Sequence, residues 1–158
     1  MKSPKVLIKE EELKEKIKEV AKKINADYQG RELTIVCVLK GALMFCTELV
    51  KYLEIPVRIE FVRLSSYGSE QKSSGVVNAL DLTLPSLKER DVLIVEDIID
   101  TGLTIQFLKD YIMTKLNPKS LKVAAMADKK IARTNDLYPD YYAFDIDEIG
   151  RASCRERV

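Results

Sequence analysis

The segment Val92–Thr104 (VLIVEDIIDTGLT) combines residues that can bind a phosphate with residues that can bind a diol or a cation. Its polar members are Glu96, Asp97, Asp100, Thr101 and Thr104, and Gly102 lies between the two threonines. Backbone N–H groups of a turn that opens a helix, with hydroxyls beside them, form a site for a phosphate dianion. Carboxylates can accept hydrogen bonds from a ribose diol or from the water shell of Mg²⁺. A sugar phosphate would use both halves of the segment, whereas acids that only cap a helix are the simpler alternative.

One other segment, one lysine and one loop carry groups that such a ligand could use. In Val38–Ala42 (VLKGA), Gly41 lets backbone amides approach an anion and Lys40 adds positive charge, although the segment also fits a plain strand-to-helix turn. Lys129 follows an apolar run, a position where lysine is commonly solvated. The small, polar loop 65–75 (SSYGSEQKSSG) is too long for a tight hairpin, so it fits either a lid over a site or an ordinary loop.

Hydrophobic periodicity predicts the elements that position these residues. The apolar runs Leu33–Leu39 and Val92–Val95 are typical of strands buried on both faces, and Glu11–Ile24 has the spacing of an amphipathic helix. Further strands are predicted over 57–64, 76–82, 121–128 and 140–146, and further helices over 42–53 and 102–116. Because strands alternate with helices, we expect an α/β fold with a mainly parallel sheet and right-handed crossovers. Ligands of such sheets bind beyond the carboxyl ends of the strands, where Glu96 and Asp97 would lie.

The composition restricts the kind of chemistry. The 158 residues suit one domain, and 26 Lys plus Arg against 25 Asp plus Glu give a net charge of +1, without a basic excess for nucleic acid. The chain contains no histidine, so Ser-His and Cys-His nucleophile pairs are excluded and any metal should be held by oxygen. The three cysteines show no paired spacing, and neither an apolar leader nor a long apolar span occurs. We expect a soluble, cytoplasmic protein that binds neither nucleic acid nor membrane.

The last residues, Gly150–Val158 (GRASCRERV), differ in character from the rest of the chain, because they carry four charges and no apolar period. One back-translation of residues 148–158 resembles a common sequencing adapter read in frame. We therefore expect one domain over residues 1–147 that is incomplete at its C-terminus, followed by a non-native tail over 148–158. A genuine disordered basic tail is the alternative.

Val92–Thr104 resembles the phosphoribosyl pyrophosphate signature of the type I phosphoribosyltransferases, and its EDIIDTG core is similar to the hypoxanthine-guanine branch. The resemblance covers Glu11–Ile146. It implies the family's fold, a central mainly parallel sheet flanked by helices, with a flexible lid loop. Val38–Ala42 resembles the family's pyrophosphate loop, in which the Leu39–Lys40 peptide bond would be cis. Ser66–Tyr67 resembles the Ser-Tyr pair of the lid.

The resemblance implies transfer of the 5-phosphoribosyl group from phosphoribosyl pyrophosphate to N9 of hypoxanthine or guanine, which gives IMP or GMP and pyrophosphate in purine salvage, with Mg²⁺ as cofactor. Asp100 would be the general base or proton relay at N7 of the purine, and Lys129 would contact the 6-oxo group. The other implied contacts are Glu96 and Asp97 to the ribose hydroxyls and Mg²⁺, Lys40 and Gly41 to pyrophosphate, Ser66 and Tyr67 in the lid, and Thr101, Gly102 and Thr104 to the 5-phosphate, with Ile99 and Leu103 as further substrate-binding residues of the same segment. The implied partners are the donor, a 6-oxopurine base and further copies of the chain, in a homo-oligomer that is a dimer or tetramer.

The chain departs from the family pattern at two places. Leu103 stands where some relatives carry lysine. The family's purine-stacking aromatic, second metal-binding aspartate and pyrophosphate arginine have no counterpart in Asp147–Glu148 or beyond, and Arg151 is not assigned to that arginine. A chain interrupted there would have weakened activity.

Two alternatives remain open. One is a phosphoribosyltransferase for uracil, xanthine or adenine, and the other is a regulatory relative that binds the donor as a signal and contacts nucleic acid. The near-neutral charge argues against the regulator, and Asp100 and Lys129 favour an enzyme.

Overall fold

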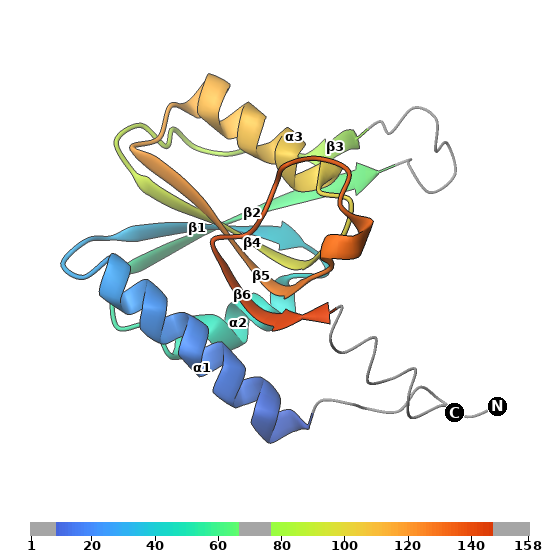
Figure 1. Ribbon diagram of the computed structural model, residues 1–158. Coiled ribbons are helices and arrows are strands. Elements are labelled where there is room, and N and C mark those ends of the chain that lie inside the picture. Colours follow the sequence, from blue (N-terminus) through green and yellow to red (C-terminus); the bar gives the residue numbers. More distant parts are fainter. Residues whose placement is uncertain (1–8, 67–76, 147–158) are drawn as a thin grey trace.

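Across residues 9–66 and 77–146, which the computed structural model describes, the chain forms one six-stranded sheet. The strand order is β3-β2-β1-β4-β5-β6, and neighbouring strands are parallel except for β2 and β3 (Figure 1). The strands are β1 Leu33–Leu39, β2 Val57–Ser66, β3 Val77–Asp81, β4 Asp91–Ile99, β5 Ser120–Asp128 and β6 Tyr141–Asp145, and the α-helices are α1 Glu10–Asp27, α2 Leu43–Lys51 and α3 Leu103–Tyr111. The predicted α/β fold with a mainly parallel sheet is confirmed.

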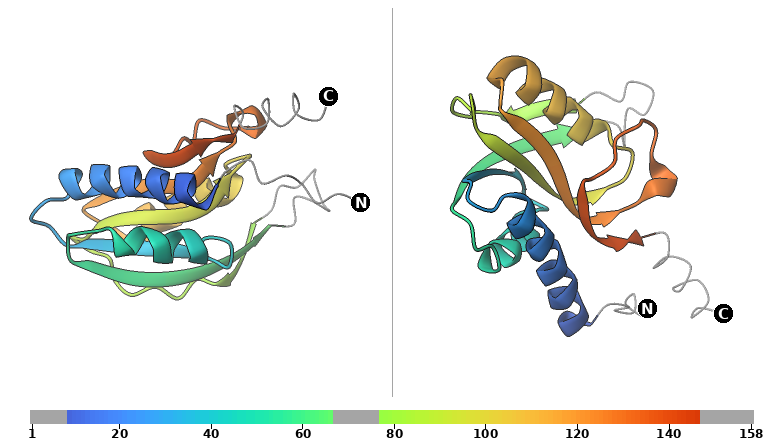
Figure 2. Two further views of the ribbon diagram at one scale, coloured as in Figure 1. Left: turned by 90° about the horizontal axis from the view of Figure 1, so that it is seen from below. Right: turned by 60° about the vertical axis from the view of Figure 1, so that its left-hand side comes forward.

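Helices cover both faces of the sheet. α1 and α2 lie on one face and α3 lies on the other, as Figures 1 and 2 show. Side chains alternate along the central strands, so Ile35 and Cys37 of β1 belong to the apolar cluster that includes α1 and α2. Val36 and Val38 belong to the cluster that includes α3. Because both faces of β1 are covered, an almost continuous apolar sequence is needed there, as the run Leu33–Leu39 predicted.

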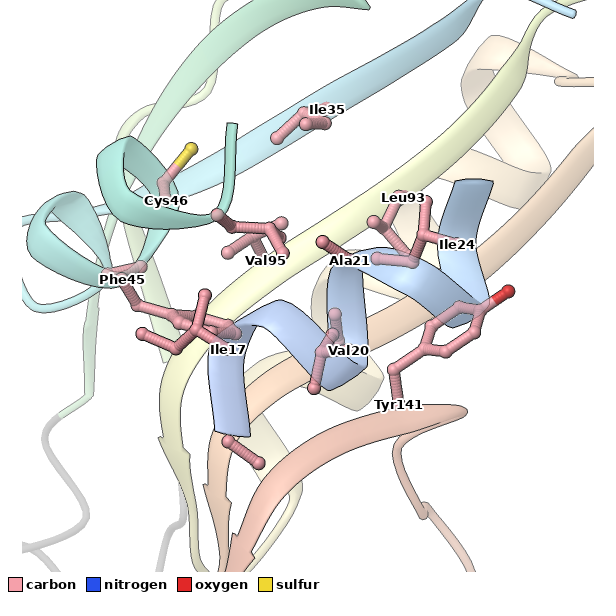
Figure 3. Packing of buried hydrophobic residues seen from close by; sticks show 14 of the residues in the cluster. Ile17, Val20, Ala21, Ile24, Ile35, Phe45, Cys46, Leu93, Val95 and Tyr141 are labelled. Carbon is pink, nitrogen blue, oxygen red and sulfur yellow. The ribbon is translucent and has the colours of Figure 1, made fainter. Parts of the chain in front are cut away.

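α1 is packed between elements that are far apart in the sequence. Its buried side chains are Ile17, Val20, Ala21 and Ile24. They pack in one cluster with Phe45 of α2 and Tyr141 of β6 (Figure 3). The Tyr141 hydroxyl also donates a hydrogen bond to Asp27 Oδ2 at the end of α1, across 114 positions of sequence. The first helix and the last strand of the described chain therefore stabilise one another.

Several predicted elements differ in extent from those observed, and β2 runs two residues into the predicted loop, to Ser66. β4 continues to Ile99 rather than ending at Val95, because it stays paired with β5 as far as Ile99 and Asp128. The helix predicted over 102–116 begins at Leu103 and becomes a π-helical segment at Ile112–Leu116.

Part of the sequence prediction lies outside the described residues. This applies to residues 67–75 of the predicted lid and to the predicted tail over 148–158. Within the described ranges, no helix is long and apolar enough to cross a membrane.

Candidate active site

The chain reverses its direction of travel across the sheet between β1 and β4. β1 pairs with β2 on one side and β4 pairs with β5 on the other, while β1 and β4 are parallel neighbours. The chain leaves β1 for α2 and leaves β4 for α3, and these helices lie on opposite faces (Figure 1). The two connections therefore diverge from adjacent strand ends. In open α/β sheets this is the position where ligands bind.

The turn after β1 lies directly over the acidic end of β4. The Leu39–Lys40 peptide bond is cis, which confirms the prediction from the resemblance. A Cβ atom added to Gly41 would lie 3.4 Å from Asp97 Cβ and 3.5 Å from Asp97 Oδ2. The glycine thus brings backbone close to a carboxylate, and the exposed side chain of Lys40 lies in the same turn. The structure brings the predicted pyrophosphate turn and the predicted metal-binding acid together.

Glu96 and Asp97 are held in an extended conformation within β4, since β4 remains paired with β5 at Glu96 and Ala125. The backbone N–H of Asp97 donates to Glu96 Oε1 at 2.7 Å. The pKa of Glu96 is raised from its ordinary 4.5 to about 7, mainly by burial and to a smaller extent by the negative charges of Asp97 and Asp100. Burial also raises the pKa of Asp97. A cation bound at this partly desolvated acid pair would offset the repulsion between its negative charges.

The turn after β4 is closed by its own side chains. Asp100 Oδ1 accepts a hydrogen bond from the Thr101 N–H at 2.9 Å, and Thr101 Oγ1 accepts one from the Leu103 N–H at 3.3 Å. Gly102 takes the N-cap position of α3 with a φ of +88°, a conformation that glycine adopts readily. α3 has no side-chain capping bond at its N-cap, and the Glu96 and Asp100 carboxylates accept from the Asp97 and Thr101 N–H groups outside α3, so helix capping does not explain these two acids. The first amides of α3 and the side chain of Thr104 are suitable for an anion.

The remaining predicted site residues occupy different environments. Lys129 follows β5 with an exposed side chain, and its N–H donates to the Ile99 carbonyl at 2.8 Å, so it is held beside the end of β4. The Ile99 side chain is buried in the cluster under α3, and Leu103 is exposed. Ser66 ends β2, but its side chain and all of Tyr67 lie outside what the structure describes. The roles assigned to these residues stay predictions.

Sequence reasoning missed the segment Arg133–Asn135, which packs behind the turn after β4. The Thr134 N–H donates to the Thr101 carbonyl at 3.0 Å, and the side chains of Arg133 and Asn135 lie beside Gly102. One signal could have indicated it. Asp128 ends an apolar strand, and a carboxylate buried at such a position requires a cationic partner.

The pKa of Glu96 gives a prediction for the stability of the metal-free protein. A carboxyl whose pKa is raised on folding stabilises the fold most below pH 4.5, and that contribution is lost as the pH rises to about 7. Replacing Glu96 by Gln should therefore stabilise the protein at pH 8, by at most about 3 kcal/mol, and the gain should vanish below pH 4.5. Urea unfolding in EDTA between pH 4 and 8 measures the difference.

Glu48→Gln is the matched control for this experiment. The pKa of the Glu48 carboxyl is lowered, because Lys51 donates a hydrogen bond to it at 3.2 Å. A glutamine there should give no gain in stability at high pH. A Glu96→Gln profile that is flat from pH 4 to 8 would contradict the burial of this carboxyl.

Comparisons with known proteins agree on one family. The phosphoribosyl transferase domain family matches residues 7–154. The chain is similar to the hypoxanthine-guanine phosphoribosyltransferase of Aquifex aeolicus, with 39% identity over 143 residues, which cover 90% of this chain and 80% of that protein. The enzyme of the same name from Bacillus subtilis is 37% identical over 142 residues, which cover 90% of this chain and 78% of that one. A crystal structure of a hypoxanthine-guanine phosphoribosyltransferase from Bacillus anthracis matches with a TM-score of 0.83 at 39% identity, covering 89% of this chain and 82% of that chain.

Proposed function

We propose that this chain, which belongs to the phosphoribosyl transferase domain family, transfers the 5-phosphoribosyl group of phosphoribosyl pyrophosphate to hypoxanthine or guanine. The products are IMP or GMP and pyrophosphate, and the reaction is one of purine salvage. One observation carries the proposal: a carboxylate pair and a turn suited to an anion lie on consecutive parts of the chain, where the connections that follow β1 and β4 diverge. A ribose that bears both phosphate and pyrophosphate fits this combination.

The acid pair suits Mg²⁺. This cation is commonly held by one or two carboxylates together with substrate phosphates and water. Glu96 is buried and lies near the negative charges of Asp97 and Asp100, which together raise its pKa, so a divalent cation would be favoured there. We assign Glu96 and Asp97 to Mg²⁺ and the ribose hydroxyls. The bound cation would neutralise charge on the pyrophosphate leaving group.

The other roles follow the positions of the side chains. Thr101, Gly102 and Thr104 would hold the 5-phosphate at the start of α3, and Lys40 with Gly41 would receive pyrophosphate from the neighbouring turn. The exposed carboxylate of Asp100 would take the proton from the purine, and Lys129 would donate to the 6-oxo group. Catalysis would come mainly from positioning and from stabilisation of charge.

A base-specificity assay tests the function. With phosphoribosyl pyrophosphate and Mg²⁺, the chain should release pyrophosphate when given hypoxanthine or guanine, and much less when given adenine, uracil or xanthine. Faster turnover with one of the latter bases would show that the base is wrongly assigned. Donor binding without turnover on any base would favour a regulatory protein instead.

The quaternary state and cellular location are further parts of the proposal. The family resemblance favours a homo-oligomer, and light scattering on the purified chain should give the mass of a dimer or tetramer rather than 18.0 kDa. We place the activity in the cytoplasm, where fluorescence of a tagged chain should be found.

Donor binding should depend on both Mg²⁺ and the acid pair. The double variant Glu96→Gln, Asp97→Asn should bind phosphoribosyl pyrophosphate roughly 10- to 100-fold more weakly in Mg²⁺, because the donor loses its metal bridge to the protein. Calorimetric titration with Mg²⁺ and with EDTA measures this, and Glu48→Gln serves as the control. Equal donor affinity of the wild type and the double variant, both in Mg²⁺ and in EDTA, would remove these residues from the metal site.

A further inference from the structure

Arg133 connects three parts of the chain through a single buried guanidinium. Its side chain is 2% exposed. Nε donates to the Asp100 carbonyl at 2.8 Å, and Nη2 donates to the Ile99 carbonyl at 3.1 Å. Nη2 also forms an ion pair with Asp128 Oδ1, and Nη1 donates to the Leu137 carbonyl. Four acceptors thus share one planar group: they come from the end of β4, the turn after β4, the end of β5 and the loop between β5 and β6.

These acceptors adjoin residues that bind different substrates in the proposed function. Asp100 lies in the turn that would hold the 5-phosphate and would take the purine proton. Asp128 precedes Lys129, the residue assigned to the purine 6-oxo group. The Ile99 carbonyl accepts hydrogen bonds from both Arg133 Nη2 and the Lys129 N–H. The guanidinium therefore links the part of the site assigned to phosphoribosyl pyrophosphate with the part assigned to the purine base.

The fork geometry of arginine is essential for this bridge. A guanidinium has five donors in a fixed plane, whereas a lysine ammonium is a compact charge on a flexible stem. A lysine at position 133 can pair with Asp128, but it cannot reach the same set of carbonyls. In the described residues, Arg133 is the ion-pair partner of Asp128, whose Oδ2 is buried without a hydrogen bond. Loss of the cation alone would leave a buried, uncompensated carboxylate.

We propose that Arg133 is a positioning residue, with Asp128 as its charge partner. It holds Lys129 in a fixed position relative to the turn Asp100–Gly102 after β4, which is called the phosphate turn below. The inference rests on the proposed function and deepens it. Arg133 itself touches no substrate, so its effect on the reaction acts through Asp100, Thr101 and Lys129. A misplacement of about 1 Å in such groups is enough to cost roughly 100-fold in rate.

Arg133→Lys tests the proposal. We expect kcat/KM to fall roughly 10- to 100-fold for both phosphoribosyl pyrophosphate and hypoxanthine, since both sides of the site shift. The dissociation constant of the donor in Mg²⁺ should rise as well. Val20→Ala, which shortens a buried side chain of α1, is the stability control, and it should lower Tm while leaving both kcat/KM values unchanged.

The double variant Arg133→Met, Asp128→Asn supplies a second measurement if Arg133→Lys does not fold. It removes the cation and the carboxylate charge together, and buried ion pairs replaced in this way are often tolerated. The folded double variant should show the same loss for both substrates. If either folded variant keeps kcat/KM within about 3-fold of wild type, or if neither folds, Arg133 is only a core residue and the proposal is overturned. A wild-type chain without turnover on any base contradicts the proposed function instead, and direct donor titration still tests the positioning of the phosphate turn.

Discussion

Replacing Gly102 by alanine should abolish measurable donor binding, whereas the same change at Gly30 should leave it intact. Both glycines have positive φ values, +88° and +77°, so alanine costs about 1–2 kcal/mol of stability at either position. At Gly102 the added Cβ would also lie 2.5 Å from Asn135 Oδ1 and 2.9 Å from Arg133 Cδ. At Gly30 nothing lies within 4 Å of the added atom.

The neighbours of Gly102 cannot easily move aside. Asn135 Oδ1 accepts a hydrogen bond from the Leu137 N–H at 3.1 Å, and Arg133 is fixed by its carbonyl contacts. Overpacking of this kind costs about 1–3 kcal/mol more, or it displaces the turn that opens α3. Calorimetric titration of both variants with the donor in Mg²⁺, together with their Tm values, separates strain from displacement. Gly102→Ala with wild-type donor affinity would mean that this turn does not hold the phosphate.

Replacing Asp100 by asparagine should lower kcat by roughly 100-fold or more, the scale expected for loss of a general base. Donor affinity should change little, because the phosphate contacts assigned to Thr101 and Thr104 remain. Asparagine keeps a side-chain oxygen that can accept from the Thr101 N–H, so the turn should keep its shape. Steady-state kinetics with hypoxanthine or guanine and donor titration measure the two quantities separately.

Asp110→Asn is the matched control for Asp100→Asn. Asp110 is an exposed aspartate of α3, the helix that follows the Asp100 turn, and it accepts a hydrogen bond from Gln106, so its replacement should leave kcat unchanged. If Asp100→Asn instead destroys donor affinity while turnover at saturating donor survives, Asp100 belongs to the phosphate site and another group must accept the proton.

The local sequence pattern was sufficient to predict the helices and strands and part of the candidate site. The apolar run Leu33–Leu39 predicted a doubly covered strand, because a strand between two layers of helices has no polar face. The acidic turn was found for a similar reason, since carboxylates, hydroxyls and glycine follow one another directly in the sequence. The cis bond at Leu39–Lys40 came from the family resemblance and not from periodicity.

Long-range contacts were not accessible in the same way. Arg133 bonds to Asp100 across 33 positions, and no spacing rule relates the two residues. The raised pKa of Glu96 depends on burial, which the pattern did not indicate because β4 was predicted to end before that residue. Both features depend on β4 and β5 remaining paired beyond their apolar parts.

The packing of α1 against β6 has a consequence for the order in which the chain folds. On a ribosome α1 emerges before the six strands described above, but Tyr141 and the other β6 residues that complete its apolar contact are made more than a hundred residues later. Until then the helix can dock only against α2 and the first strands, and part of its apolar face stays in water. A contact between residues this far apart in the sequence costs chain entropy when the loop between them closes, so local helix formation precedes it. β6 therefore completes the packing of α1, and the nascent chain gains the stability of this contact only after β6 has been synthesised.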